Sequence, residues 1–380
     1  MTTTQYLLTT CQVGAEAALK DELAYAKPPL RPSYGRPGFV TFKLPEPVDM
    51  TAALSFQPVF AQVWALSLGR VRDGEATDAE RAKQAAAIVA QAEIGAPVHL
   101  HVWDRDQTGE SSAARGPEPL GRTREAGGTR AARTGTAVDD HRAADALRGH
   151  LATAGVALHR HEPRVGDFVL DVVLVEEGEW WLGLHRHARG RGPLPGGRFV
   201  LDPLDGAPSR AWQKIDEAIA CFELPLRAGD VVVEIGSAPG GIAMALLRRD
   251  VHVVGIDAAA MSPDVMSYAR THSARCSFRH VPVSADRVSR RDLPPKVDWI
   301  VSDINAVPPI ALATVDDVVA LLRDKPRGLV VTLKLGEPGL ETRIAGYMER
   351  LRRQGYDEVA CRQLPANRRE VTLAAWSSRR

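Results

Sequence analysis

The sequence predicts an α/β protein, with a doubly wound parallel sheet in its carboxyl-terminal half and an α+β region before it. Two observations support this fold class. From residue 203 onward, short apolar runs alternate with stretches of helical period, which is the pattern of buried parallel strands flanked by helices. The chain also has 380 residues, which is the length of about two or three domains.

The amino-terminal half contains segments typical of strands and of helices. Strands are expected at residues 6–10, 38–44, 63–71 and 98–103, with a β-hairpin at 167–175 and 179–184. Helices are expected at residues 14–26 and 137–154. The stretch 104–136 has almost no large apolar residues, which predicts a solvated loop, with an RNA-contacting loop as the alternative.

A dense basic cluster, residues 185–198, separates the two halves. It reads His-Arg-His-Ala-Arg-Gly-Arg-Gly-Pro-Leu-Pro-Gly-Gly-Arg, and its glycines and prolines indicate a linker. Two interpretations remain open. The cluster is either a solvated linker or a hinge whose cations contact nucleic-acid phosphates.

The carboxyl-terminal half follows a regular alternation of strands and helices. Strands are expected at residues 231–235, 252–256, 278–281, 299–302 and 328–334. Helices are expected at residues 211–222, 241–249, 315–323 and 339–354. Two late strands, 358–363 and 370–376, have no clear helix between them, so we expect a hairpin that adds an antiparallel strand to the sheet.

Composition narrows the classes of function. The 48 Lys and Arg residues nearly balance the 47 Asp and Glu residues, for a formal net charge of +1. No global field therefore attracts nucleic acid, and any such surface would be a local patch. Hydrophobic residues at 44% and charged residues at 25% exclude a wholly disordered chain. Lysine is scarce beside arginine, so a lysine at a chemically meaningful position is informative.

The four cysteines and the chain start bear on compartment and metal binding. Cys11, Cys221, Cys276 and Cys361 are far apart, and no Cys/His spacing fits a zinc site, so no metal site is predicted. The first residues lack a secretory pattern, and no apolar run approaches the ~20 residues of a membrane span. We therefore expect a reduced, cytoplasmic protein that makes no membrane contact.

A glycine-rich turn follows the first strand of the carboxyl-terminal half, in the sequence Glu-Ile-Gly-Ser-Ala-Pro-Gly-Gly. Gly236 allows the backbone to turn sharply. Gly240 and Gly241 are expected to let a ligand approach the start of the next helix. The ligand should therefore lie beyond the carboxyl end of this strand.

The residues around the turn narrow the choice of ligand. A dinucleotide turn needs a glycine where this chain has Ala238, and Pro239 has no N–H to donate, which argues against NAD. Asp257 ends the next strand, at about the 20-residue distance where a carboxylate meets ribose hydroxyls. A ribose-bearing ligand without a pyrophosphate fits this turn, and S-adenosylmethionine is the leading example.

Four charged residues are predicted to converge at one edge of the sheet. Asp303 and Lys334 end predicted buried strands, Glu370 begins one, and Lys214 lies in the helix before the sheet. Two neighbouring lysines disfavour each other's charge, so one amine is expected to be neutral enough near pH 7 to take a proton. Two carboxylates would orient the amines. Such a group suits a reaction whose nucleophile is a weakly acidic alcohol.

The segments that carry these residues resemble the FtsJ-like ribosomal RNA 2′-O-methyltransferases over about residues 205–378. The matching segments are Ser-Arg-Ala-Trp-Gln-Lys at 209–214, the turn at 236–241, Val-Ser-Asp at 301–303, Leu-Lys-Leu at 333–335 and Arg-Glu-Val-Thr at 369–372. The chain is most similar to the RlmM branch, which methylates a cytidine ribose of large-subunit ribosomal RNA.

This resemblance implies a class I (Rossmann-like) methyltransferase domain that uses S-adenosylmethionine and needs no metal. It implies a catalytic tetrad of Lys214, Asp303, Lys334 and Glu370, with Lys334 as the base. The residues implied in cofactor binding are Gly236, Ser237, Ala238, Pro239, Gly240, Gly241, Asp257, Asp286 and Asp303.

The resemblance also implies a division into domains. Residues 1–60 would be a ferredoxin-like piece, 61–195 a THUMP-like RNA-binding domain and 205–380 the methyltransferase domain. The implied partner is RNA, expected to be large-subunit ribosomal RNA before or during ribosome assembly. A monomer is expected, although nothing in the sequence determines the oligomeric state.

Three alternatives remain open. The chemistry could act on another RNA, such as transfer RNA or a messenger cap. The chain could be a non-catalytic RNA-binding assembly factor that keeps the fold, although an intact tetrad argues against this. An NAD-dependent oxidoreductase is the third, opposed by the Ala-Pro turn and by the lack of a hydride-transfer constellation.

Overall fold

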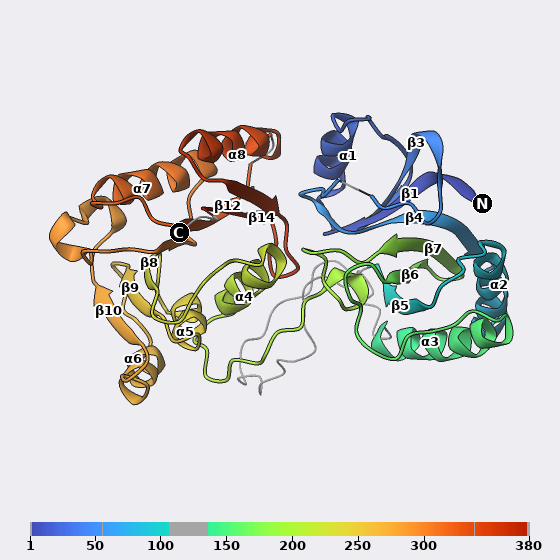
Figure 1. The fold of residues 1–380 in the computed structure, drawn as a ribbon, viewed down its shortest axis with the longest axis horizontal. Helices are drawn as coiled ribbons and strands as arrows, with labels where there is room; N and C mark the ends of the chain where they lie inside the picture. The colour runs from blue at the N-terminus through green and yellow to red at the C-terminus, as the bar shows by residue number, and fades with distance from the viewer. Residues whose placement is uncertain (1, 55, 106–135, 338, 378–380) are drawn as a thin grey trace, which may run out of the picture.

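A computed structural model describes residues 2–54, 56–105, 136–337 and 339–377 of the chain (Figure 1). It contains two seven-stranded sheets, which lie in two lobes side by side. Most of the loop predicted at 104–136 lies outside the described residues. Within the described ranges, no helix combines the length and the hydropathy that crossing a bilayer requires.

The amino-terminal sheet has the strand order β2-β3-β1-β4-β7-β6-β5. Its strands are β1 (Thr3–Cys11), β2 (Arg31–Arg36), β3 (Phe39–Asp49), β4 (Ala61–Arg72), β5 (Val98–Asp104), β6 (Phe168–Glu176) and β7 (Glu179–Arg186). Neighbouring strands are antiparallel except β5 and β6, which run parallel. Because β1 pairs with β4, residues on both sides of the predicted boundary at residue 60 share one continuous sheet.

Three helices cover this sheet. They are α1 (Glu16–Ala24), α2 (Asp78–Gln91) and α3 (Thr136–Thr153). The apolar face of α1 packs on β1 and β3 through Leu19 and Leu23. Helices α2 and α3 pack together on the other half of the sheet, against β4 to β7.

The carboxyl-terminal sheet has the order β10-β9-β8-β11-β12-β14-β13. Its strands are β8 (Val231–Ile235), β9 (His252–Ile256), β10 (Ser277–Val281), β11 (Trp299–Ser302), β12 (Gly328–Lys334), β13 (Glu358–Arg362) and β14 (Glu370–Trp376). The first five follow the doubly wound order 3-2-1-4-5 of Rossmann-like sheets, and β14 is antiparallel to both of its neighbours. The predicted fold class and the predicted hairpin are both confirmed.

Helices cover both faces of this second sheet. One face carries α4 (Ala211–Phe222), α5 (Gly241–Leu247) and α6 (Pro263–Thr271), whose apolar residues share a core with β8, β9 and β11. The other carries α7 (Pro308–Ala320) and α8 (Ile344–Arg353). Short 3₁₀ turns occur at Pro195–Gly197, Ala285–Arg287, Arg290–Asp292 and Glu341–Arg343. The sheet is thus packed between two layers of helices. The edge at which its parallel strands end is left for the side chains of the loops that follow them.

Several elements differ from the sequence prediction. Strand β2 was not predicted, because its proline reads as a turn; the strand lies at the sheet edge, where a missing N–H is tolerated. Helix α2 was missed because its buried face consists mainly of alanines, although Thr77 and Glu80 form a capping box. Helix α6 was also missed. Helix α7 begins at Pro308, seven residues before the predicted start, because proline is favoured in the first turn.

The basic cluster 185–198 is packed rather than solvated at its centre. Arg191 is 9% exposed, donates to the Trp64 carbonyl oxygen at 2.8 Å, and places its guanidinium 3.7 Å from the centre of the Trp64 ring. His185 is buried and bonded to Asp171 at 2.5 Å. Arg191 is therefore neither a solvated linker residue nor a cation available to a phosphate, so both interpretations of the cluster are wrong for this residue. Instead, Arg191 ties the linker to the amino-terminal sheet.

A buried arginine joins the two lobes. Arg362, at the end of β13, is 6% exposed, and it donates to the carbonyl oxygens of Gly190 at 2.6 Å and of Ala61 at 2.9 Å. Beside it, the Gln363 N–H donates to the Val59 carbonyl oxygen at 2.8 Å. Backbone groups of the amino-terminal lobe and the linker are thus satisfied by the carboxyl-terminal sheet.

We expect Arg362→Met to destabilise the protein. Methionine fills much of the volume but removes the arginine hydrogen bonds to the carbonyl oxygens of Ala61 and Gly190, which should lower the free energy of unfolding by about 2–4 kcal/mol. Denaturant unfolding of the full chain measures this. The matched control is Arg353→Met, whose side chain is 77% exposed, with an expected change within about 0.5 kcal/mol. Equal unfolding midpoints for the two variants would show that Arg362 does not hold the lobes together.

Candidate active site

The fold brings the four predicted tetrad residues to one edge of the carboxyl-terminal sheet. Lys334 is the last residue of β12 and Asp303 follows β11, so both lie at the carboxyl ends of parallel strands. Glu370 begins the antiparallel strand β14 and pairs in register with Lys334. Lys214 reaches the same point from the second turn of α4. The antiparallel direction of β14 is what brings a residue from the start of a strand to the edge where the others end.

The four side chains form a closed ring of alternating charge. Lys214 Nζ lies 3.0 Å from Asp303 Oδ2 and 2.6 Å from Glu370 Oε1. Lys334 Nζ lies 2.6 Å from Asp303 Oδ1 and 2.6 Å from Glu370 Oε2. Each ammonium therefore bridges both carboxylates, and each carboxylate divides its two oxygens between the two ammonium groups.

Burial and charge set the protonation of this ring. The four side chains are between 9% and 23% exposed, with Lys334 the most exposed. Burial alone would lower the pKa of Lys334, but the charges and hydrogen bonds of Asp303 and Glu370 more than offset it and raise the pKa above its ordinary value. The expectation that repulsion between lysines leaves one amine neutral is therefore wrong for this state, because a carboxylate lies between them on each side.

The glycine-rich turn adopts the backbone that its sequence predicted. Gly236 has φ of 80°, and Gly240 has φ of 112° as it caps α5. A Cβ at Gly236 would lie 2.9 Å from the Ile304 side chain and 3.3 Å from the Asp303 carbonyl oxygen, so the turn packs closely against the backbone that carries Asp303. At Gly240 and Gly241 the direction in which a side chain would point is filled by the protein itself, so packing requires glycine at both positions. The expectation that a ligand approaches the start of the helix here stays a prediction. A Cβ at Gly240 would lie 2.5 Å from Val265, and one at Gly241 would lie 2.2 Å from Ser209 Oγ.

The predicted ribose-binding carboxylate lies against this turn. Asp257 follows β9, is half-buried, and accepts the Ala238 N–H at 3.0 Å and the Ala259 N–H at 2.8 Å. Pro239 follows Ala238 in the same turn. Asp286 lies in the 3₁₀ turn after β10, where it is exposed and where hydrogen bonds from Ser284 and its own backbone lower its pKa. Asp257 therefore directly follows the carboxyl end of β9, and Asp286 lies five residues beyond the carboxyl end of β10.

Glu234 is a member of the site that sequence reasoning did not assign. It is 1% exposed in β8 and accepts a hydrogen bond from Ser237 Oγ at 2.7 Å. Burial, together with the nearby charges of Asp303 and Asp257, raises the pKa of Glu234 to about 8. The signal was an acidic residue inside an otherwise apolar strand. A carboxyl group that is neutral near pH 7 lets the chain hold the turn without adding a negative charge behind the tetrad.

Comparison with known proteins agrees with this geometry. Residues 207–363 match the family described as FtsJ-like methyltransferase. This part of the chain is therefore similar to the FtsJ-like methyltransferases. The resemblance predicted from the sequence is confirmed for this part of the chain, and the tetrad residues Lys214, Asp303 and Lys334 lie inside the matched range.

Relatives of the FtsJ-like methyltransferase domain extend the match. The chain is 28% identical over 243 residues to ribosomal RNA large subunit methyltransferase M of Shewanella loihica, covering 60% of this chain and 63% of that protein. It is 29% identical over 259 residues to the protein of the same name from Xylella fastidiosa strain 9a5c, covering 62% and 65%. The Azotobacter vinelandii protein is 32% identical over 177 residues, covering 44% and 47%. The aligned part thus spans less than two thirds of each relative's length.

We expect Gly241→Ala to disrupt the start of α5. The new Cβ would lie 2.2 Å from Ser209 Oγ and 2.8 Å from the Ser209 carbonyl oxygen. The second atom belongs to the backbone, which can move away only at a cost in free energy. The expected loss is about 1–3 kcal/mol of unfolding free energy, measured by chemical denaturation. Gly346→Ala in α8 is the matched control, because nothing lies within 4 Å of its Cβ position; it should be neutral or up to about 1 kcal/mol more stable. A Gly241→Ala variant as stable as this control would contradict the packing account.

Proposed function

We propose that this chain is an S-adenosylmethionine-dependent RNA ribose 2′-O-methyltransferase that acts on large-subunit ribosomal RNA. The observation that carries the proposal is the ring of two lysines and two carboxylates at the carboxyl edge, where the glycine-rich turn packs against the backbone of Asp303. The match to the FtsJ-like methyltransferase family supports methyl transfer, and the similarity to proteins named ribosomal RNA large subunit methyltransferase M supports a ribosomal RNA substrate.

The residues at the turn fit S-adenosylmethionine as the methyl donor. Asp257 presents a half-buried carboxylate whose oxygens each keep a lone pair beyond the backbone bond they accept. Asp286 offers an ionised carboxylate one strand further along, suited to an adenine amino group. Gly236, Ser237, Ala238, Pro239, Gly240 and Gly241 would form the floor of the site, with Asp303 between donor and tetrad. When bound, the donor supplies an electrophilic methyl group on a cationic sulfur.

Lys334 is proposed to take the proton from the ribose 2′-hydroxyl as its oxygen attacks the methyl carbon. The Lys334 ammonium must first lose its own proton, and its side chain is 23% exposed, so water can accept it. Asp303 and Glu370 then hold the neutral amine in place, and Lys214 offsets one of their two negative charges. Alignment of hydroxyl, base and methyl group accounts for the largest share of the rate, up to ~7–11 kcal/mol of barrier.

The amino-terminal lobe is proposed to hold structured RNA, with residues 1–60 as a ferredoxin-like piece and 61–195 as a THUMP-like domain. The net charge of the whole chain is only +1, so phosphate contacts would have to come from a local group of arginines on this lobe. RNA would be gripped by shape and phosphate contacts, and the base would be presented to the carboxyl-terminal lobe. A substrate in ribosomal RNA would also place the protein in the cytoplasm.

Lys334→Ala should abolish methyl transfer while leaving donor binding nearly intact. Loss of a general base costs about 10²–10⁴ in rate, and the substitution is on the tetrad rather than on the turn. Transfer of a labelled methyl group to large-subunit RNA from cells lacking the gene measures the rate, and titration with S-adenosylhomocysteine measures binding.

The matched control is Lys296→Ala, because this lysine is 77% exposed and precedes β11 at the opposite edge of the sheet. It should retain the rate of the unmodified protein. Mapping of alkali-resistant positions should show one 2′-O-methyl group that depends on the gene and on Lys334. Wild-type turnover in Lys334→Ala would remove this residue as the base, and methylation confined to transfer RNA would overturn the substrate.

The rate of methyl transfer should rise with pH across the neutral range. Asp303 and Glu370 raise the pKa of Lys334, so the reactive neutral amine is a small fraction that grows about tenfold per pH unit below that pKa. Single-turnover rates at saturating donor from pH 6 to pH 9, read as a logarithmic plot, measure this. Affinity for S-adenosylhomocysteine over the same range is the control and should stay nearly constant. A flat rate profile would contradict a proton transfer to Lys334.

A further inference from the structure

Three histidines gather in the amino-terminal lobe, far from the tetrad in the fold. His99, His159 and His161 each offer a ring nitrogen, and these atoms all lie within 4.8 Å of one another. The ring centres of His99 and His159 are 4.3 Å apart, those of His159 and His161 4.7 Å, and those of His99 and His161 5.1 Å. His99 is buried, His159 is half-buried and His161 is exposed.

Backbone pairing explains why the three residues meet. The segment after α3 runs beside β5, with the Val98 N–H donating to the Ala157 carbonyl oxygen and the His159 N–H donating to the Val98 carbonyl oxygen. This pairing places His159 next to His99. His161 follows two residues later, where the chain bends, and its ring centre lies 4.7 Å from that of His159 and 5.1 Å from that of His99.

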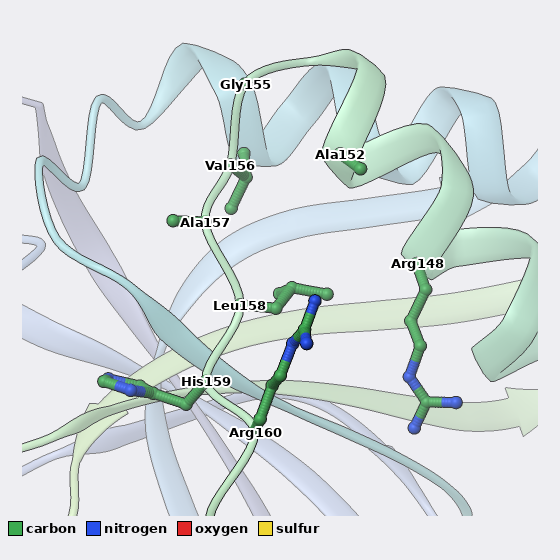
Figure 2. Close-up of a pocket in the computed structure, with 8 residues that line it drawn as sticks. All are labelled: Arg148, Ala152, Gly155, Val156, Ala157, Leu158, His159 and Arg160. Carbon is green, nitrogen blue, oxygen red and sulfur yellow. The ribbon is translucent and has the colours of Figure 1, made fainter.

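The side chain of His159 faces away from the neighbouring arginines. His159 lines a cavity of about 550 Å³ together with Arg148 and Arg160. Figure 2 shows the His159 ring leaving the loop on the side opposite to these two guanidinium groups. The imidazole cluster is therefore not the floor of a cationic pocket but a separate group against β5.

Hydrogen bonds fix which nitrogens are free. His99 Nε2–H donates to Asp167 Oδ2 at 3.0 Å, since an ionised carboxylate can only accept, and this leaves the lone pair on Nδ1. His161 Nδ1–H donates to the Glu162 carbonyl oxygen at 2.8 Å, which leaves the lone pair on Nε2. A carboxylate or a carbonyl behind the imidazole is the usual support of a metal-ligating histidine.

We propose that His99, His159 and His161 bind a divalent transition-metal ion, with Zn²⁺ as the ion that three neutral imidazoles suit best. The metal would pin the segment 157–162 to β5, and its fourth position would be open to water because His161 is exposed. Sequence spacing did not reveal the site, because one ligand is separated from the other two by about sixty residues of chain that includes the whole of α3.

Binding requires only small rotations. Ligand nitrogens in a tetrahedral zinc site are about 3.4 Å apart, from Zn–N distances of about 2.0–2.1 Å. The three nitrogens start within 4.8 Å, so each must move by roughly an ångström. His159 is stacked on His99 with an interplanar angle of 18°, and it would turn out of this stack toward the ion. His159 and His161 lie on a surface segment, where such turns are cheap.

The test is titration of the full chain, prepared without a histidine tag and stripped of metal, with ZnCl₂ and separately with CoCl₂. We expect one equivalent of Zn²⁺ in competition with a chromophoric chelator, and a Co²⁺ visible spectrum of tetrahedral intensity without a thiolate band, because all four cysteines are buried elsewhere. His161→Ala should weaken Zn²⁺ binding at least about tenfold without unfolding the chain, because the side chain is exposed.

His159→Ala should do the same, and Asp167→Asn should weaken binding less than either. The matched control is His141→Ala, an exposed histidine of α3 that lies outside the cluster. It should bind Zn²⁺ as the unmodified chain does. Absence of stoichiometric Zn²⁺ binding, or equal binding by His161→Ala, His159→Ala and the control, would show that the cluster is held by ring stacking alone and would overturn the proposal. Neither outcome depends on methyl transfer.

Discussion

Mutual neutralisation of two ammonium and two carboxylate groups is the constraint on which the carboxyl-terminal lobe depends. These side chains are only 9–23% exposed, and contacts of 2.6–3.0 Å to two partners of opposite sign compensate for the lost hydration. The ring fixes the register of β12 and β14, because Lys334 and Glu370 must face each other across the pair. It also fixes the direction of β14, since a parallel strand would carry its first residue to the opposite edge. The hairpin of β13 and β14 is therefore a requirement of the site and not an addition to the sheet.

The surroundings of the ring limit negative charge. Asp257 and Asp303 both lie near Glu234, and burial raises the pKa of Glu234 to about 8, so that a third carboxylate is not ionised there at neutral pH. The neutral carboxyl group of Glu234 accepts a hydrogen bond from the Ser237 hydroxyl and holds Ser237 inside the turn. The turn in turn contacts Asp303 through its backbone. These contacts connect the glycine-rich turn to the ring of four charged side chains, so a substitution in the turn is expected to affect the ring, and the reverse.

Much of this architecture could be predicted from the sequence, for a physical reason. Buried parallel strands are uniformly apolar, so charged residues at their ends stand out, and strand direction alone places Asp303 and Lys334 together. What the sequence could not supply depends on distance and packing. It did not reveal that carboxylates separate the two lysines, which reverses the expected shift of the Lys334 pKa, or that packing against Ser209 requires glycine at position 241. Arg191 read as a free cation, but it is buried on Trp64. Helix α2, whose buried face is mainly alanine, and the edge strand β2 contain too few large apolar residues for the hydrophobic pattern of the sequence to reveal them.

The most direct measurement of the account's central claim is the ionisation of Lys334 itself, followed by the carbon chemical shift of its side chain in lysine-labelled protein. Lysines are few in this chain, and Lys334→Arg assigns the signal. The account predicts a pKa above the ordinary lysine value in the free protein, and a lower one with S-adenosylmethionine than with S-adenosylhomocysteine, because only the former brings a cationic sulfur beside the amine. Identical titration with both molecules would contradict it, since the ring would then lie outside the field of the donor.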